Sequence, residues 1–89
     1  MAIYLLDGKD MTSREEAFSL ISKELELPEY FGRNLDALYD CLTEKSSDHT
    51  VVFVNTAILE EYLGEYGQKI LNVFRDAAAE CGFEFKEKR

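Results

Sequence analysis

The chain has 89 residues, and its 18 Asp and Glu against 10 Lys and Arg give a formal net charge of −8. This charge disfavours sequence-independent binding to nucleic acid, which needs cations to displace phosphate counterions, and binding to an anionic membrane surface. A chain of this length forms one modest core, and 46% hydrophobic residues indicate a globular protein rather than a disordered one. We therefore expect a single domain over residues 1–89 whose partner is basic.

The sequence carries no recognisable targeting or membrane signal. The apolar segment from Ala2 to Leu6 is too short for the core of a signal peptide, and no apolar run approaches the ~20 residues of a membrane span. We expect a cytoplasmic protein.

The first predicted elements are a strand and a helix. Residues 3–6 are apolar and form a strand that ends at Asp7-Gly8. Ser13 and Glu16 then make a capping box, which opens a helix. Its apolar face contains Ala17, Phe18, Leu20, Ile21 and Leu25.

An aromatic loop precedes the second helix. Tyr30 and Phe31 are adjacent, so their side chains cannot both point the same way, and Phe31 is the better candidate for burial because it has no polar group. From these residues alone, packing of both rings on the following helix is equally compatible. Gly32 permits a sharp turn, and Asn34 is placed to cap the helix that follows.

The second helix has an apolar face and an acidic flank. Its leucines recur at helical spacing, whereas Asp36, Asp40 and Glu44 follow one another at i, i+4 and i+8. Arg33 is the one cation spaced to relieve Asp36, and Asp40 has no basic residue three or four positions away. The flank is either a solvated face or a surface that meets a partner. On spacing alone the solvated face is favoured.

The second half of the chain alternates strand and helix again. Residues 50–54 form a continuous β-branched and aromatic run, typical of a central strand covered on both faces. Asn55 is placed to cap a short helix over residues 58–62, and Gly64 to Gly67 form a break. These features indicate an α/β domain.

A longer helix over residues 68–80 follows the break, with Gly82 as its stop and an alternating strand over residues 83–86 after it. Asp76 and Glu80 share the polar side of this helix. They are either solvated charges beside Arg75 or an extension of the acidic flank of the second helix.

Cys41 and Cys81 fall on predicted helices, and neither has a Cys or His at metal-ligand spacing. We expect reduced, buried thiols, with a disulfide as the minor alternative. His49, the only histidine, is expected in a polar turn beside Asp48. The sequence has no nucleophile elbow, phosphate loop or converging carboxylates, so we expect no catalytic residue, no metal site and no cofactor.

The run LPEYFGRNLDALYDCL, residues 27–42, resembles the signature segment of the barstar family, intracellular protein inhibitors of secreted ribonucleases. A weaker similarity covers residues 73–77 and 79–80. The resemblance implies a small α/β domain with a three-stranded parallel sheet and about four helices. The positions where family members contact the ribonuclease are occupied by Tyr30, Asn34, Asp36, Tyr39, Asp40, Thr43, Glu44 and Asp76. Three positions depart from the family pattern: Tyr39 stands where Trp is frequent, Arg33 puts a positive charge beside the acidic flank, and Glu44 replaces a small residue.

By this resemblance the protein blocks a basic, barnase-like ribonuclease, with Asp40 deepest in the phosphate site and Glu80 adding to the surrounding field. We expect a monomer when free. The alternative is an acidic interaction or immunity module for another basic protein or toxin that is not a ribonuclease.

Overall fold

The computed structural model describes residues 2–45 and 47–89. Three parallel strands, β1 (Ala2–Asp7), β2 (His49–Val54) and β3 (Glu84–Glu87), form a sheet in the order β1-β2-β3. The helices are α1 (Arg14–Glu24), α2 (Leu35–Glu44), α3 (Thr56–Leu63) and α4 (Glu65–Cys81), with a short 3-10 turn, η1 (Gly8–Asp10), after β1. The predicted α/β fold, with β2 in the centre of the sheet, is confirmed.

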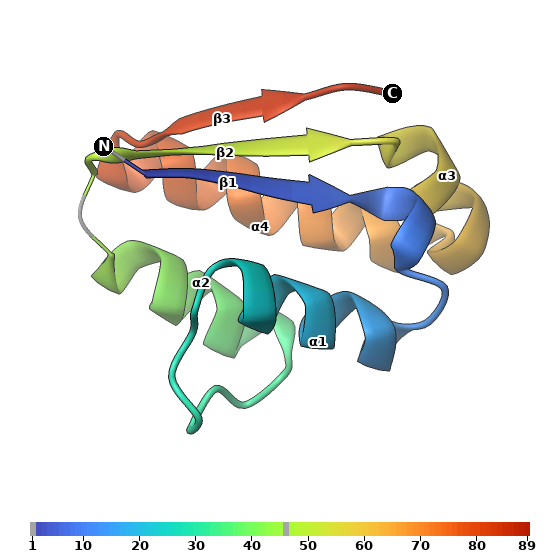
Figure 1. Ribbon diagram of the computed structural model, residues 1–89, viewed down its shortest axis with the longest axis horizontal. Helices are drawn as coiled ribbons and strands as arrows, with labels where there is room; N and C mark the ends of the chain where they lie inside the picture. Colours follow the sequence, from blue (N-terminus) through green and yellow to red (C-terminus); the bar gives the residue numbers. More distant parts are fainter. Residues whose placement is uncertain (1, 46) are drawn as a thin grey trace.

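One face of the sheet carries the core. Leu6, Val51 and Phe53 are fully buried, and Phe74 of α4 packs against Phe53 and Phe85 with ring centroids 5.7 and 5.3 Å apart. Figure 1 shows α4, α1 and α2 beneath the strands and α3 at the carboxyl ends of β1 and β2. Burial of these large apolar side chains against one sheet face supplies most of the stabilisation that this short chain obtains.

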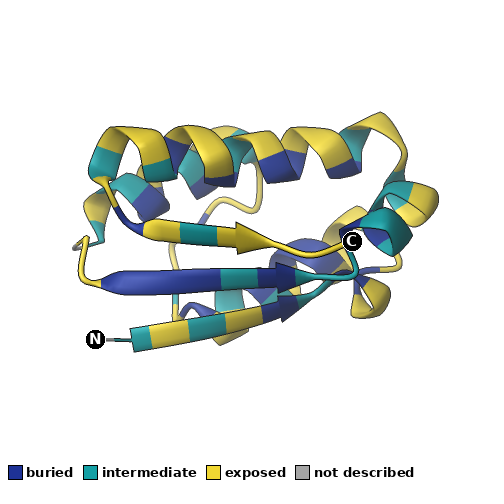
Figure 2. Ribbon diagram, turned by 90° about the horizontal axis from the view of Figure 1, so that it is seen from above, coloured by how far each residue is buried: buried dark blue, intermediate teal, exposed yellow. Residues whose placement is uncertain are grey.

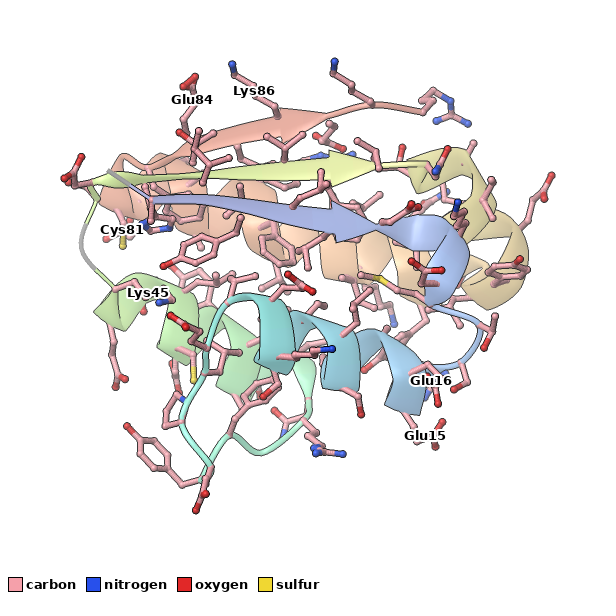
Figure 3. The ribbon with its side chains drawn as sticks, in the orientation of Figure 1. Glu15, Glu16, Lys45, Cys81, Glu84 and Lys86 are labelled. Carbon is pink, nitrogen blue, oxygen red and sulfur yellow. The ribbon has the colours of Figure 1, made fainter. Side chains whose placement is uncertain are left out.

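The opposite face of the sheet is open. Ile3 and Leu5 of β1 are 70% and 57% exposed, and Val52 beside Leu5 is half-buried. The expectation that β2 is covered on both faces is therefore wrong, because the helices lie on one side of the sheet (Figures 1 and 2). Glu84 and Lys86, which form an ion pair 3.7 Å long, point away from the helices in Figure 3.

The junction between β2 and α3 also differs from the sequence prediction. Asn55 has left-handed backbone angles (φ 55°, ψ 43°) and makes no side-chain cap. Its side-chain Nδ2 instead donates a hydrogen bond of 2.8 Å to Asp7 Oδ1, and this bond links the ends of β1 and β2. Gly8 fits beneath this junction, since a Cβ there would lie 2.3 Å from the Asn55 carbonyl oxygen.

Helices α3 and α4 are separated by a single residue rather than by a break of four. Gly64 takes a backbone conformation (φ 59°, ψ −134°) that side-chain-bearing residues adopt only with strain. Helix α4 consequently begins at Glu65, three residues before the predicted start, and Gly67 lies buried against Leu59.

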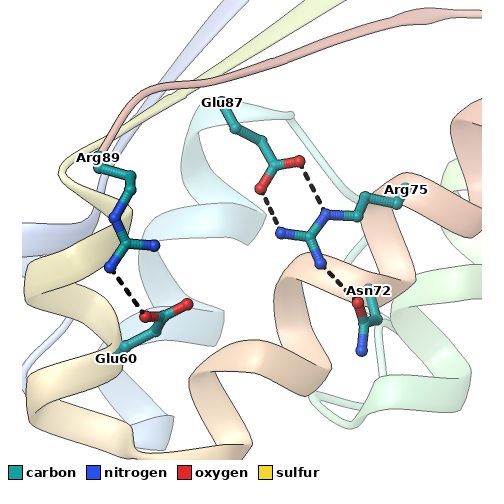
Figure 4. A network of polar contacts seen from close by, with 5 residues as sticks. All are labelled: Glu60, Asn72, Arg75, Glu87 and Arg89. Carbon is teal, nitrogen blue, oxygen red and sulfur yellow. Dashed lines mark hydrogen bonds and ion pairs between the residues drawn. The ribbon is translucent and has the colours of Figure 1, made fainter.

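Strand β3 is fastened to α4 by Arg75. Its guanidinium makes two bonds to the Glu87 carboxylate, 2.7 and 2.5 Å long, and a third to Asn72 Oδ1 (Figure 4). A bidentate Arg–carboxylate pair fixes geometry as well as charge. Arg75 is thereby directed toward β3, and Arg89 pairs with Glu60 nearby.

Candidate functional site

The loop between α1 and α2 presents one aromatic ring to solvent and anchors another. Phe31 is buried with its ring centroid 6.0 Å from that of Phe18, whereas Tyr30 is 79% exposed. The Phe31 amide donates to the Pro28 carbonyl, which closes the turn. The choice of Phe31 for burial is confirmed, and Tyr30 remains available for contact.

Asn34 begins α2 as predicted. Its Oδ1 accepts a 2.8 Å hydrogen bond from the Ala37 amide, and its Nδ2 donates to the Gly32 carbonyl. The side chain therefore sets the direction of the helix while staying exposed. Leu38 and Leu42 are fully buried, which holds the acidic flank of α2 toward solvent.

Five carboxylates, together called the acidic surface, are exposed on α2 and α4: Asp36, Asp40, Glu44, Asp76 and Glu80. The two helices pack against each other, and the Cys81 thiol donates a 3.6 Å hydrogen bond to the Thr43 carbonyl at their carboxyl ends. Figure 3 shows Cys81 at the same end of the molecule as Lys45, which follows α2. Asp76 and Glu80 thus lie on a helix next to the flank of α2.

Tyr39 lies where the two helices meet. Burial raises the pKa of its phenol, and the carboxylates of Glu80, Asp76 and Asp40 raise it further, in that order. The same hydroxyl is thus influenced by carboxylates from both helices. The structure therefore brings together Tyr39, Asp40, Asp76 and Glu80, which the sequence placed on two separate segments.

A hollow of about 280 Å³ lies between the loop and α2, and we call it the acidic hollow. Its lining consists of Tyr30, Phe31, Gly32, Ala37, Asp40, Cys41 and Glu44. Burial raises the pKa of the Cys41 thiol, and Glu44 and Asp40 raise it further, so the thiol stays protonated at neutral pH. Cys41 lines this hollow, although its spacing in the sequence did not identify it as a site residue.

None of the five carboxylates has a Lys or Arg nitrogen within 4 Å in the part of the chain that the structure describes. Arg33 does not relieve Asp36 as expected, because its Nη1 is directed to Ser19 Oγ of α1 at 3.5 Å. Arg75, which follows Phe74 and precedes Asp76, is bound to Glu87 on the other side of α4. The acidic surface is therefore not neutralised by the protein's own cations.

Comparison with known proteins identifies the family of this chain. A family model described as Barstar (barnase inhibitor) matches residues 1–88. The chain belongs to the barstar family. It is 37% identical over 83 residues to a protein of Bacillus subtilis (strain 168) named "Putative ribonuclease inhibitor YrdF", with 92% of this chain and 91% of that protein covered. The family match includes both helices that carry the acidic surface.

The remaining titratable groups of interest lie elsewhere. The expectation that His49 lies in a surface turn is wrong. His49 is the first residue of β2, is buried, and stacks on Phe83 with ring centroids 4.5 Å apart.

Cys41 and Cys81 are free thiols, the first buried and the second half-buried. Within residues 2–45 and 47–89, no three His, Cys, Asp or Glu side chains are grouped to hold a metal ion. Among the helices described, none is long and apolar enough to cross a membrane.

Proposed function

We propose that this barstar-family protein inhibits a ribonuclease by inserting its acidic surface into the enzyme's basic active-site cleft. The observation that carries the proposal is the set of five exposed carboxylates on α2 and α4 without a cation within 4 Å among the residues described. The relative named as a ribonuclease inhibitor supports the same class of partner.

Asp40 is the central group of the proposed contact. It lines the acidic hollow together with the exposed Tyr30 and Glu44, so a cationic side chain that enters the hollow meets its carboxylate. A ribonuclease cleft holds RNA phosphates with Lys, Arg and His, and carboxylates accept charge-assisted hydrogen bonds from the same donors. The inhibitor thereby occupies the phosphate positions and excludes RNA.

Aromatic and rim residues complete the proposed interface. Tyr30 and Tyr39 flank Asp40 and exclude water from the charge pairs, which strengthens each pair by lowering the local dielectric constant. Asn34, the N-cap of α2, and Thr43, in its last turn, complete the set of proposed contacts. Glu44, Asp76 and Glu80 surround this centre and draw a basic partner toward it.

The proposal is tested by titrating the purified protein against a panel of basic microbial ribonucleases while RNA cleavage is followed. We expect near-stoichiometric inhibition of at least one enzyme, strong loss in the Asp36→Ala/Asp40→Ala double variant, and full retention in Glu61→Ala, an exposed carboxylate of α3. A folded parent protein, checked by circular dichroism, that inhibits none of the panel would favour a different basic protein as the partner.

A further inference from the structure

A second hollow lies between α1, α4 and the end of the loop that precedes α2. Its volume is about 230 Å³, and its lining consists of Arg14, Glu15, Phe18, Arg33 and Tyr66. Two guanidinium groups and one carboxylate, that of Glu15, line it, so its net charge is positive in a chain whose net charge is −8, and we call it the cationic hollow.

Both arginines are held in place without being neutralised. The Arg14 guanidinium carbon lies 4.0 Å from the centroid of the Tyr66 ring, and Arg33 Nη1 lies 3.5 Å from Ser19 Oγ. Arg33 also has a left-handed backbone (φ 53°), a conformation that few non-glycine residues adopt. Neither guanidinium has a carboxylate oxygen within 4 Å across residues 2–45 and 47–89, so both retain donors for an incoming anion.

The cationic hollow and the acidic hollow lie side by side. Phe18 lines the first and Phe31 lines the second, and the centroids of these two rings are 6.0 Å apart. Arg33 is also the residue directly after Gly32, which lines the acidic hollow. A stable protein interface covers roughly 800 Å² of each partner, so a protein seated on the acidic hollow extends over its neighbour.

We propose that the ribonuclease places an Asp or Glu side chain from the rim of its basic cleft in the cationic hollow. This inference rests on the proposed function and narrows the partner to ribonucleases whose cleft is basic and whose adjoining rim is acidic. A carboxylate matches the planar donor array of a guanidinium, and the Phe18 and Tyr66 rings shield such a pair from water. A rim Lys or Arg at the same place is repelled, which makes the hollow a determinant of specificity.

The charge reversal Arg33→Glu distinguishes two kinds of partner surface, one that is basic throughout and one that places a carboxylate in the cationic hollow. If the partner surface is basic throughout, Arg33→Glu adds an attractive charge and strengthens binding. If a carboxylate enters the hollow, Arg33→Glu places like charges together and weakens binding, on the order of 100-fold. Arg14→Gln should weaken binding by about tenfold, because one donor group is lost without repulsion.

The experiment measures dissociation constants for the parent, Arg33→Glu, Arg14→Gln and the control Lys86→Glu against a ribonuclease that the parent inhibits. Lys86 lies on the open face of the sheet, so this control makes the same change in net charge away from both hollows. Replacing the facing rim carboxylate of the ribonuclease by Arg should restore tight binding to Arg33→Glu.

The two proposals fail in different ways. Absence of inhibition by the parent protein contradicts the proposed function itself. If the parent inhibits and Arg33→Glu binds as tightly as Lys86→Glu or more tightly, the cationic hollow receives no carboxylate, while inhibition through the acidic surface stands.

Discussion

Asp40 is an exposed carboxylate that lines the acidic hollow, and no Lys or Arg nitrogen of the described chain lies within 4 Å of it. In the proposed complex it compensates buried cations of the ribonuclease. We expect Asp40→Ala to leave those cations without a counter-charge, which speeds dissociation and costs on the order of 3–5 kcal/mol of binding free energy. Surface-plasmon kinetics check this, with Glu61→Ala as the control for loss of one charge. Binding of Asp40→Ala as tight as that of the parent would contradict the mechanism.

Tyr39 offers a prediction about pH. Its phenol has a pKa above the ordinary 10.0, because burial first, and then Glu80 and the other negative groups, disfavour the phenolate in the folded protein. A raised pKa contributes stability that is complete below the unfolded value and is lost as pH rises through the folded value. We therefore expect the free energy of unfolding of Tyr39→Phe to fall less than that of the parent between about pH 9 and 11. Urea titrations at several pH values measure the difference, and parallel curves for the two proteins would refute it.

The exposure of the site side chains was predictable from the sequence where helical periodicity determines which side of a helix faces solvent. The spacing of Leu38 and Leu42 fixes which flank of α2 faces solvent, and hence the exposure of Asp40. The direction of Arg33 was not predictable, because it depends on a left-handed backbone outside the helix and on a hydroxyl of α1 fourteen residues earlier. The influence of Glu80 and Asp76 of α4 on the pKa of Tyr39 was not predictable either, because it depends on the packing of two helices distant in sequence.

At the scale of elements, adjacent residues of β1 lie in different environments, one in the core and one on the open face of the sheet. Leu6 is fully buried against the helices, whereas its neighbour Leu5 is 57% exposed on the open face. We expect Leu6→Ala to lower the free energy of unfolding by about 2–5 kcal/mol, because it removes buried methyl groups and leaves a cavity. The same substitution at Leu5 should cost less than about 1 kcal/mol, since surface changes are usually small. Chemical denaturation of the two variants measures both values, and equal losses would show that the second sheet face is covered in solution.

Local sequence patterns predicted the helices and strands themselves better than they predicted which other elements pack against them. The alternation of strands and helices, the Ser13 cap and the stop at Gly82 all appear in the structure. The apolar run of β2 suggested helices on both faces, but sequence composition does not specify where helices are placed across a sheet. Helix α4 can start at Glu65 because Gly64 adopts an unusual backbone conformation. Gly67 then lies within α4 and packs against Leu59 of α3.

At the scale of the whole molecule, charge is distributed unevenly. Five carboxylates of the acidic surface lie on α2 and α4, while the outward face of β3 carries the paired Glu84 and Lys86. Figure 3 shows this pair pointing away from the helices. The field that a basic partner encounters is therefore strongest on the helical side, and the molecule has a preferred direction of approach.

This direction can be measured by removing one charge at different places. Glu80→Gln and Glu61→Gln change the net charge equally, but Glu80 belongs to the acidic surface and Glu61 lies on α3. We expect Glu80→Gln to slow association with the ribonuclease by a modest factor and Glu61→Gln to have little effect. The difference should shrink as salt rises, because exposed charges are screened beyond about 8–10 Å at physiological ionic strength. Stopped-flow association rates at two salt concentrations provide the measurement. Equal slowing by the two variants would show that total charge, rather than its placement on α2 and α4, governs encounter.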